Sequence, residues 1–129
     1  MEKTRVMVVD DELDFLKLLK MNLDETGKYE VLTLSNAKHI IAQVQNFKPD
    51  VMLLDILMPS IGGIEVCEML NRDTYGKGVP VIILSALQKE HDKLEAYKVG
   101  VVDYLIKPVD IDTLVARIER AVALKKGMA

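Results

Sequence analysis

The feature that most constrains this chain is a regular alternation between short apolar runs of strand length and longer segments of helical period. Five strands are expected, at residues 5–9, 29–34, 51–54, 79–84 and 103–106. Five helices are expected, the first beginning just after Asp11 and the others at residues 37–47, 64–72, 89–99 and 111–125. This alternation is typical of an α/β fold in which helices cover both faces of a parallel sheet.

The strand candidates differ in how apolar they are, and this difference predicts their order of burial. Residues 5–9, 51–54 and 79–84 are mostly Val, Ile, Leu and Met. Such near-continuous apolar runs are typical of parallel strands that are buried on both faces. We therefore expect these three strands to be the central ones.

The first helix candidate shows which of its sides should face the sheet. Four leucines recur at helical spacing, with Phe15 and Leu18 flanking them: Leu13, Leu16, Leu19 and Leu23. A stripe of this kind predicts an amphipathic helix that packs these leucines against the sheet.

Length and composition restrict the class of protein. The 129 residues are expected to form one domain, residues 1–129, with enough apolar side chain (50% hydrophobic) to fill a core without a disulfide or structural metal. The single cysteine, Cys67, is expected in that core. We expect a cytoplasmic protein without a membrane segment, since no apolar stretch approaches the length of a signal peptide or membrane helix. A formal net charge of −3 disfavours direct binding to nucleic acid.

Polar residues follow four of the five strand candidates, at the edge of the sheet where open α/β folds bind ligands. They are Asp10, Asp11 and Glu12 after the first strand, Asp55 after the third, Ser85 and Ala86 after the fourth, and Lys107 and Pro108 after the fifth. A lone aspartate there would more simply cap the next helix, but Asp55 brings a further carboxylate to the same edge. Two carboxylates about 4 Å apart repel by roughly 4 kcal/mol at an effective dielectric constant near 20. A positive group must compensate for this repulsion.

Two positive groups could do so: Lys107 and a divalent cation. No His or Cys stands with these carboxylates in the sequence, and an all-oxygen donor set selects a hard ion. Mg²⁺ binds through one or two carboxylates and keeps several waters, which suits a shallow site that also admits a phosphate. Lys107 would then face one phosphoryl oxygen, and the Ser85 hydroxyl would donate to another.

In this order, these residues resemble the response-regulator receiver domain of bacterial two-component signalling, from about Arg5 to Leu124. The matching motifs are Val8-Val9-Asp10-Asp11-Glu12, Asp55-Ile56-Leu57-Met58-Pro59 with Gly63 beyond, Ser85-Ala86, Ala96 with Gly100, and Asp103-Tyr104-Leu105-Ile106-Lys107-Pro108. The resemblance implies a flavodoxin-like, doubly wound sheet of five parallel strands in the order 2-1-3-4-5.

The resemblance also implies how the acidic residues work. Asp55 would accept a phosphoryl group from a sensor histidine kinase. Asp11, Asp55 and the backbone carbonyl of Leu57 would bind Mg²⁺ directly, and Asp10 would reach the ion through water. The domain would be a signalling phosphoacceptor rather than an enzyme, because it would catalyse only its own phosphorylation and dephosphorylation.

The remaining matches imply a switch. Lys107 and Ser85 would hold phosphoryl oxygens, and the Lys107-Pro108 bond would be cis. Taken by itself, Tyr104 is most simply an aromatic residue packed within a strand. The resemblance implies a further role, because in the family the ring turns inward as the hydroxyl at the Ser85 position moves toward the phosphoryl group. The surface of the last two helices and last strand would change and control an output domain or effector protein. A homodimer through that surface is a further expectation.

The sequence departs from the receiver pattern in one loop and is unusual at two positions beside the acceptor. The family commonly has Asp or Asn where this chain has Gly62, so the third helix is expected to lack that cap, with Ser60 or water as a substitute and a looser loop. Leu57 and Leu87 flank the expected acyl phosphate, and neither side chain can orient an attacking water. We therefore expect a long-lived phosphoryl group.

Three other functions are compatible with parts of the pattern. A flavin-binding module shares the architecture, but Asp10, Asp11 and Glu12 would repel the flavin phosphate. An aspartyl phosphatase needs an acid two residues after its nucleophile, where this chain has Leu57. A receiver-like interaction module that is never phosphorylated remains the main alternative. His39 and His91 are expected to be solvent-facing helix residues.

Overall fold

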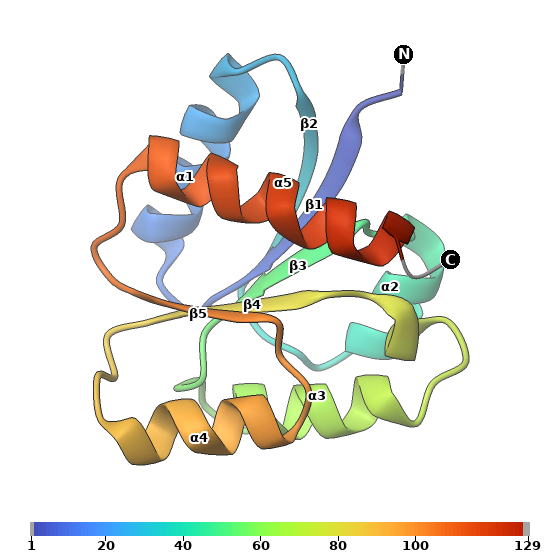
Figure 1. Cartoon of the computed structure of the whole chain (residues 1–129), viewed down its shortest axis with the longest axis vertical. Helices are drawn as coiled ribbons and strands as arrows, with labels where there is room; N and C mark the ends of the chain where they lie inside the picture. Colours follow the sequence, from blue (N-terminus) through green and yellow to red (C-terminus); the bar gives the residue numbers. More distant parts are fainter. Residues whose placement is uncertain (1, 128–129) are drawn as a thin grey trace.

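The computed structural model describes residues 2–127 and contains one parallel sheet in the order β2-β1-β3-β4-β5 (Figure 1). The strands are β1 (Thr4–Val9), β2 (Tyr29–Leu34), β3 (Val51–Leu54), β4 (Val81–Ser85) and β5 (Asp103–Ile106). The helices are α1 (Leu13–Glu25), α2 (Ile40–Phe47), α3 (Gly63–Asn71), α4 (Glu90–Lys98) and α5 (Ile111–Gly127), with a 3-10 turn η1 (Gly76–Gly78). The predicted fold class and strand order are confirmed.

Helices cover the sheet on both faces. The apolar cluster on one face includes side chains from α1 and α5, and the cluster on the other includes side chains from α2, α3 and α4. Every residue of β3 and β4 is buried, and the last four residues of β1 are buried. The three strands predicted to be central are therefore β1, β3 and β4, as expected.

The prediction for α1 is right for three of its four leucines and wrong for the first. Leu16, Leu19 and Leu23 are buried against the sheet, whereas Leu13 is 63% exposed. At 3.6 residues per turn, Leu13 points about 90° away from the mean direction of the other three. The buried side of α1 is therefore narrower than the spacing of the four leucines predicts.

Several element boundaries differ from the prediction by one to three residues, and two of these differences have a clear local reason. Helix α2 begins at Ile40 rather than residue 37, because the Asn36 side chain accepts a hydrogen bond from the Lys38 amide (3.0 Å) and forms a turn first. Strand β4 begins two residues later than expected, since Pro80 has no amide hydrogen for the sheet and η1 precedes it.

Other sequence expectations are confirmed. Cys67 is buried in the cluster that includes α3, and His91 is an exposed residue of α4. His39 is also exposed, but it lies in the turn before α2 rather than in the helix. Within residues 2–127, no helix has both the length and the apolar composition needed to cross a membrane.

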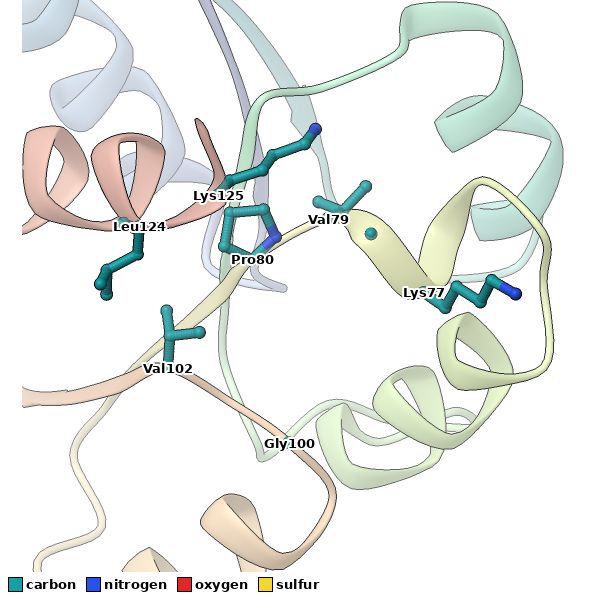
Figure 2. Close-up of a pocket in the computed structure, with 9 residues that line it drawn as sticks. Lys77, Val79, Pro80, Gly100, Val102, Leu124 and Lys125 are labelled. Carbon is teal, nitrogen blue, oxygen red and sulfur yellow. The ribbon is translucent and has the colours of Figure 1, made fainter. Parts of the chain in front are cut away.

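The amino end of the sheet is hollowed and apolar. A cavity of about 380 Å³ lies where the chain enters β4 and β5, beside the last turns of α5 (Figure 2). Pro80, Val102 and Leu124 are part of its lining, and the side chains of Lys77 and Lys125 extend from its rim in different directions.

Candidate functional site

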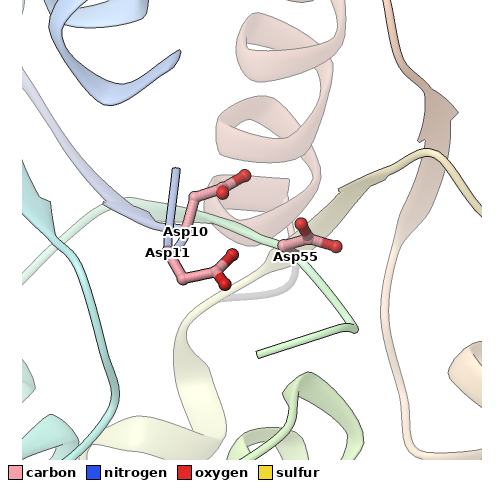
Figure 3. Close-up of side chains that lie close together, drawn as sticks. All are labelled: Asp10, Asp11 and Asp55. Atoms are coloured by element: carbon pink, nitrogen blue, oxygen red, sulfur yellow. The ribbon is translucent and has the colours of Figure 1, made fainter. Parts of the chain in front are cut away.

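The carboxyl ends of β1 and β3 bring three aspartates together. The residue after each of these strands is still hydrogen-bonded to the neighbouring strand. The Asp10 amide donates to the Leu34 carbonyl and the Asp55 amide donates to the Val9 carbonyl, both at 3.1 Å. Because these two strands end side by side, a carboxylate oxygen from each of Asp10, Asp11 and Asp55 lies within 4.8 Å of the others (Figure 3).

The three carboxylates differ in burial and in hydrogen bonding. Asp10 and Asp55 are buried, at 1% and 7% exposed, and Asp11 is exposed. Asp10 Oδ1 accepts the Glu12 amide hydrogen (3.0 Å), and Asp55 Oδ1 accepts that of Leu57 (3.2 Å). Burial raises the pKa of Asp10 above its ordinary value, although hydrogen bonds from Lys107 and the Glu12 amide act in the opposite direction.

Lys107, at the end of β5, is the positive group of the site. Its Nζ donates to Asp10 Oδ2 at 2.7 Å, to Glu12 Oε1 at 3.0 Å and to Asp55 Oδ2 at 3.3 Å. It also lies 4.2 Å from the centre of the Phe15 ring, a cation-π distance. Burial lowers the pKa of Lys107, but the surrounding carboxylates outweigh this effect and hold the pKa above its ordinary value, so the ammonium stays charged.

Helix capping does not account for these aspartates. The residue that caps α1 is Glu12, and no side chain hydrogen-bonds to the first turn there. The Asp10 carboxylate binds an amide that precedes the helix, and Asp55 precedes a loop rather than a helix. Neither Asp10 nor Asp55 therefore acts as the N-cap of a helix.

Ser85 and Tyr104 approach each other through the loop that follows β4. Ser85 is the last residue of β4, is 1% exposed, and its Oγ accepts the Leu87 amide hydrogen at 3.2 Å. The Tyr104 hydroxyl donates to the Leu87 carbonyl at 2.8 Å, and the residue is 8% exposed. Both side chains thus hold the backbone of the same residue.

The loop between β3 and α3 is closely packed at Gly63. Gly62 caps α3 without a side-chain hydrogen bond, so Ser60 does not replace the missing cap. Instead the Gly63 amide donates to the Ile56 carbonyl at 2.9 Å. A Cβ on Gly63 would overlap the Asp55 carbonyl oxygen and lie 2.8 Å from Ile56 Cα, so only glycine permits this approach.

The structure also shows two participants to which the sequence pattern assigned no role. Glu12 was noted only as a polar residue after the first strand, and Phe15 only as a flank of the α1 leucine stripe, yet both contact the Lys107 ammonium. Glu12 and Phe15 are three residues apart at the start of α1, a spacing that places two side chains on the same side of a helix. This spacing is the sequence feature that indicates a shared contact. The Lys107-Pro108 bond is cis, as expected.

The donor set fits Mg²⁺. Ligands of an octahedral Mg²⁺ at about 2.1 Å lie roughly 3 to 4.2 Å apart, so oxygens already within 4.8 Å of one another need only small movements. The cluster offers carboxylate oxygens without His or Cys, which is the preference of a hard cation. Three carboxylates lie within 3.3 Å of one ammonium, and Asp11 adds a fourth negative charge to the cluster, so a divalent cation would also relieve their repulsion.

Comparison with known proteins places the chain in a family. The response regulator receiver domain family matches residues 6–119. The chain therefore belongs to this family and is a receiver domain of the kind found in two-component response regulators.

Curated relatives differ in length. The alkaline phosphatase synthesis transcriptional regulatory protein PhoP of Bacillus subtilis is 34% identical over 89% of this chain, which spans 47% of PhoP. Protein PilH of Pseudomonas aeruginosa is 35% identical over 92% of this chain, which spans 98% of PilH. The chain thus spans about half the length of the regulator PhoP and nearly all of PilH.

Solved structures show the same fold. The receiver domain of the Francisella response regulator 1452 has 30% identity and a TM-score of 0.84, covering 94% of this chain and 98% of its own. Vibrio cholerae chemotaxis protein CheY4 has 27% identity and a TM-score of 0.86, covering 93% of this chain and 99% of its own.

Proposed function

We propose that this receiver domain accepts a phosphoryl group on Asp55 from a sensor histidine kinase. The observation that carries the proposal is the convergence of Asp10, Asp11 and Asp55, two of which, Asp10 and Asp55, also contact the Lys107 ammonium. An Asp55 oxygen would attack phosphorus as the bond from phosphorus to the donor imidazole breaks, and the imidazole would leave neutral after taking up a proton. The product is an acyl phosphate, and the domain would act as a signalling phosphoacceptor rather than as a turnover enzyme.

Asp10, Asp11, Asp55 and the Leu57 backbone carbonyl are the groups that would hold Mg²⁺. When bound, the ion would neutralise charge on the transferring phosphoryl group. The chain itself orients the acceptor carboxylate. The Leu57 amide donates to Asp55 Oδ1, and Asp55 Oδ2 faces Lys107. Lys107 would bind one phosphoryl oxygen, and the Ser85 hydroxyl another.

The output would be a changed surface on α4, β5 and α5. In support, α4 buries only Ala96 among its nine residues, so little apolar contact holds it against the sheet. Four large apolar side chains on or beside these elements are at least 39% exposed: Leu94, Tyr97, Val102 and Leu124. If Ser85 moves toward a phosphoryl group, it releases the Leu87 amide in the segment that Tyr104 also holds. This surface would control an output domain or a cytoplasmic effector, or form a homodimer.

The acyl phosphate would be long-lived for this family. Leu57 is 60% exposed beside the acceptor and carries no group that orients water, and Leu87 uses its backbone rather than its side chain in the contacts above. A half-life of seconds for the isolated phosphorylated domain would contradict this expectation.

Incubation with acetyl phosphate and Mg²⁺, followed by intact mass measurement, tests the proposal. We expect a gain of about 80 Da, the mass of one phosphoryl group, which Asp55→Ala abolishes. No gain in the native domain would favour the alternative of an unphosphorylated interaction module. Continuous release of phosphate at a high turnover number would instead favour an aspartyl phosphatase.

A further inference from the structure

The proposed transfer leaves one carboxylate around Lys107 without a role, that of Glu12. Lys107 Nζ is 3.0 Å from Glu12 Oε1 and 2.7 Å from Asp10 Oδ2, but 3.3 Å from Asp55 Oδ2. An ammonium group has three hydrogens to donate, so three carboxylates engage all of them. The ammonium thus lies nearer to the α1 side of the site than to the acceptor.

Glu12 is the partner that Lys107 can release most easily. Its side chain is 63% exposed, whereas that of Asp10 is 2% exposed. A carboxylate that turns into water is solvated again, but a buried one left without its partner is not. Glu12 provides no side-chain hydrogen bond to the first turn of α1, so movement of its side chain breaks no cap of the helix.

The charges of the site give the expected direction. Asp10, Asp11, Glu12 and Asp55 can carry four negative charges against one on Lys107. A phosphoryl donor adds negative charge and needs a hydrogen from the ammonium. Glu12 competes with the donor for a hydrogen of Lys107. The Phe15 ring lies 4.2 Å from the same ammonium group.

We propose that Glu12 is a positioning residue that holds Lys107 on the α1 side of the site and thereby slows phosphorylation of Asp55. This inference rests on the proposed function. It assigns to Glu12 no contact with the reacting atoms: it acts through Lys107.

The test compares Glu12→Gln with Asp14→Asn in the full chain, with acetyl phosphate and Mg²⁺ as the probe and the rate of mass gain as the readout. Both variants remove one negative charge from the start of α1, since Asp14 stands in its first turn. Asp14 is exposed, and it lies outside the contacts of Lys107 described above. We expect Glu12→Gln to raise the rate by about two- to fivefold, the range of a largely exposed ion pair, and Asp14→Asn to leave it near the native value.

Salt separates an ion pair from a structural effect. At about 1 M ionic strength the Debye length falls to roughly 3 Å, so the ratio of the Glu12→Gln rate to the native rate should approach one. A structural change would leave the ratio unchanged. Equal rates at low salt, a slower Glu12→Gln variant, or an equal increase in Asp14→Asn would each overturn the inference alone. No phosphorylation of the native domain would overturn the proposed function and the inference together.

Discussion

The two ends of the same sheet differ in what they bury. At the carboxyl end, Asp10 and Asp55 are buried and lie within hydrogen-bonding distance of Lys107. At the amino end, a cavity of about 380 Å³ has an apolar lining that includes Val102 and Leu124 (Figure 2). The comparison teaches that the candidate site of this domain is marked by converging charges and not by the volume of a cavity.

Two glycines, one at each end of the sheet, also differ in how closely other backbone atoms pack against them. Gly63 at the carboxyl end has no room for a Cβ, because the backbone of Asp55 and Ile56 occupies that space. Gly78, in the turn that precedes β4 at the amino end, has open space instead, since a Cβ added there would meet no atom within 4 Å. Of these two glycines, the one beside the charges therefore tolerates an added side chain least.

The largest expected effect is that of Gly63→Ala. The new methyl group would push against backbone atoms that cannot move independently of Asp55, so we expect the free energy of unfolding to fall by about 3 kcal/mol or more and the affinity for Mg²⁺ to weaken. Denaturant unfolding and calorimetry measure the two effects. Gly78→Ala is the matched control and should be neutral or stabilising by up to about 1 kcal/mol; similar losses in both variants would contradict the division between the two ends.

The pH dependence of the free energy of unfolding tests whether the apolar core excludes a charged group, in contrast to the carboxyl end of the sheet, which contains several. Burial raises the pKa of the Cys67 thiol to about 12, above its value in the unfolded chain. The native state therefore keeps its proton where the unfolded state loses it, so this contribution is complete below about pH 8 and is lost as pH rises toward 12.

The stability of the native protein relative to Cys67→Ala should accordingly fall by about 1 to 2 kcal/mol between pH 8 and pH 10. Chemical denaturation of both proteins at each pH gives this difference and cancels the other alkaline titrations. A difference that does not change with pH would show that the thiol ionises as readily in the core as in water.

Mg²⁺ should stabilise the carboxyl end by a smaller amount. A free concentration about ten times the dissociation constant adds about 1.4 kcal/mol to the free energy of unfolding. Asp11→Asn should remove most of this gain, because it takes a charge from the cluster. Lys77→Gln, at the rim of the amino-end cavity, should retain the gain. An equal gain in both variants would place the ion elsewhere.

The fold could be predicted from the sequence because hydrophobic pattern depends on neighbours in the chain. The apolar runs of β1, β3 and β4 indicated central strands, and the positions were correct to within two residues. The pattern failed where a local polar contact or a change of direction decided the outcome, as at Asn36 before α2 and at Leu13.

The site could be predicted in part. Asp10, Asp55 and Lys107 follow strands, and the parallel topology brings strand ends to one edge. The partnership of Glu12 with Lys107 was missed because Glu12 lies beyond the strand end, and its contact depends on the direction of its side chain rather than on the strand order. The tight packing at Gly63 likewise could not be predicted, because it depends on how the loop after β3 folds back against the backbone of Asp55 and Ile56.

Reduction of the phosphorylated domain with borohydride tests the central claim most directly. Borohydride converts an aspartyl phosphate to homoserine, which peptide mass spectrometry locates to a single residue. The account predicts homoserine at Asp55, formed only when Mg²⁺ accompanied acetyl phosphate. Homoserine at another aspartate, or none in a domain that has gained phosphoryl mass, would contradict it.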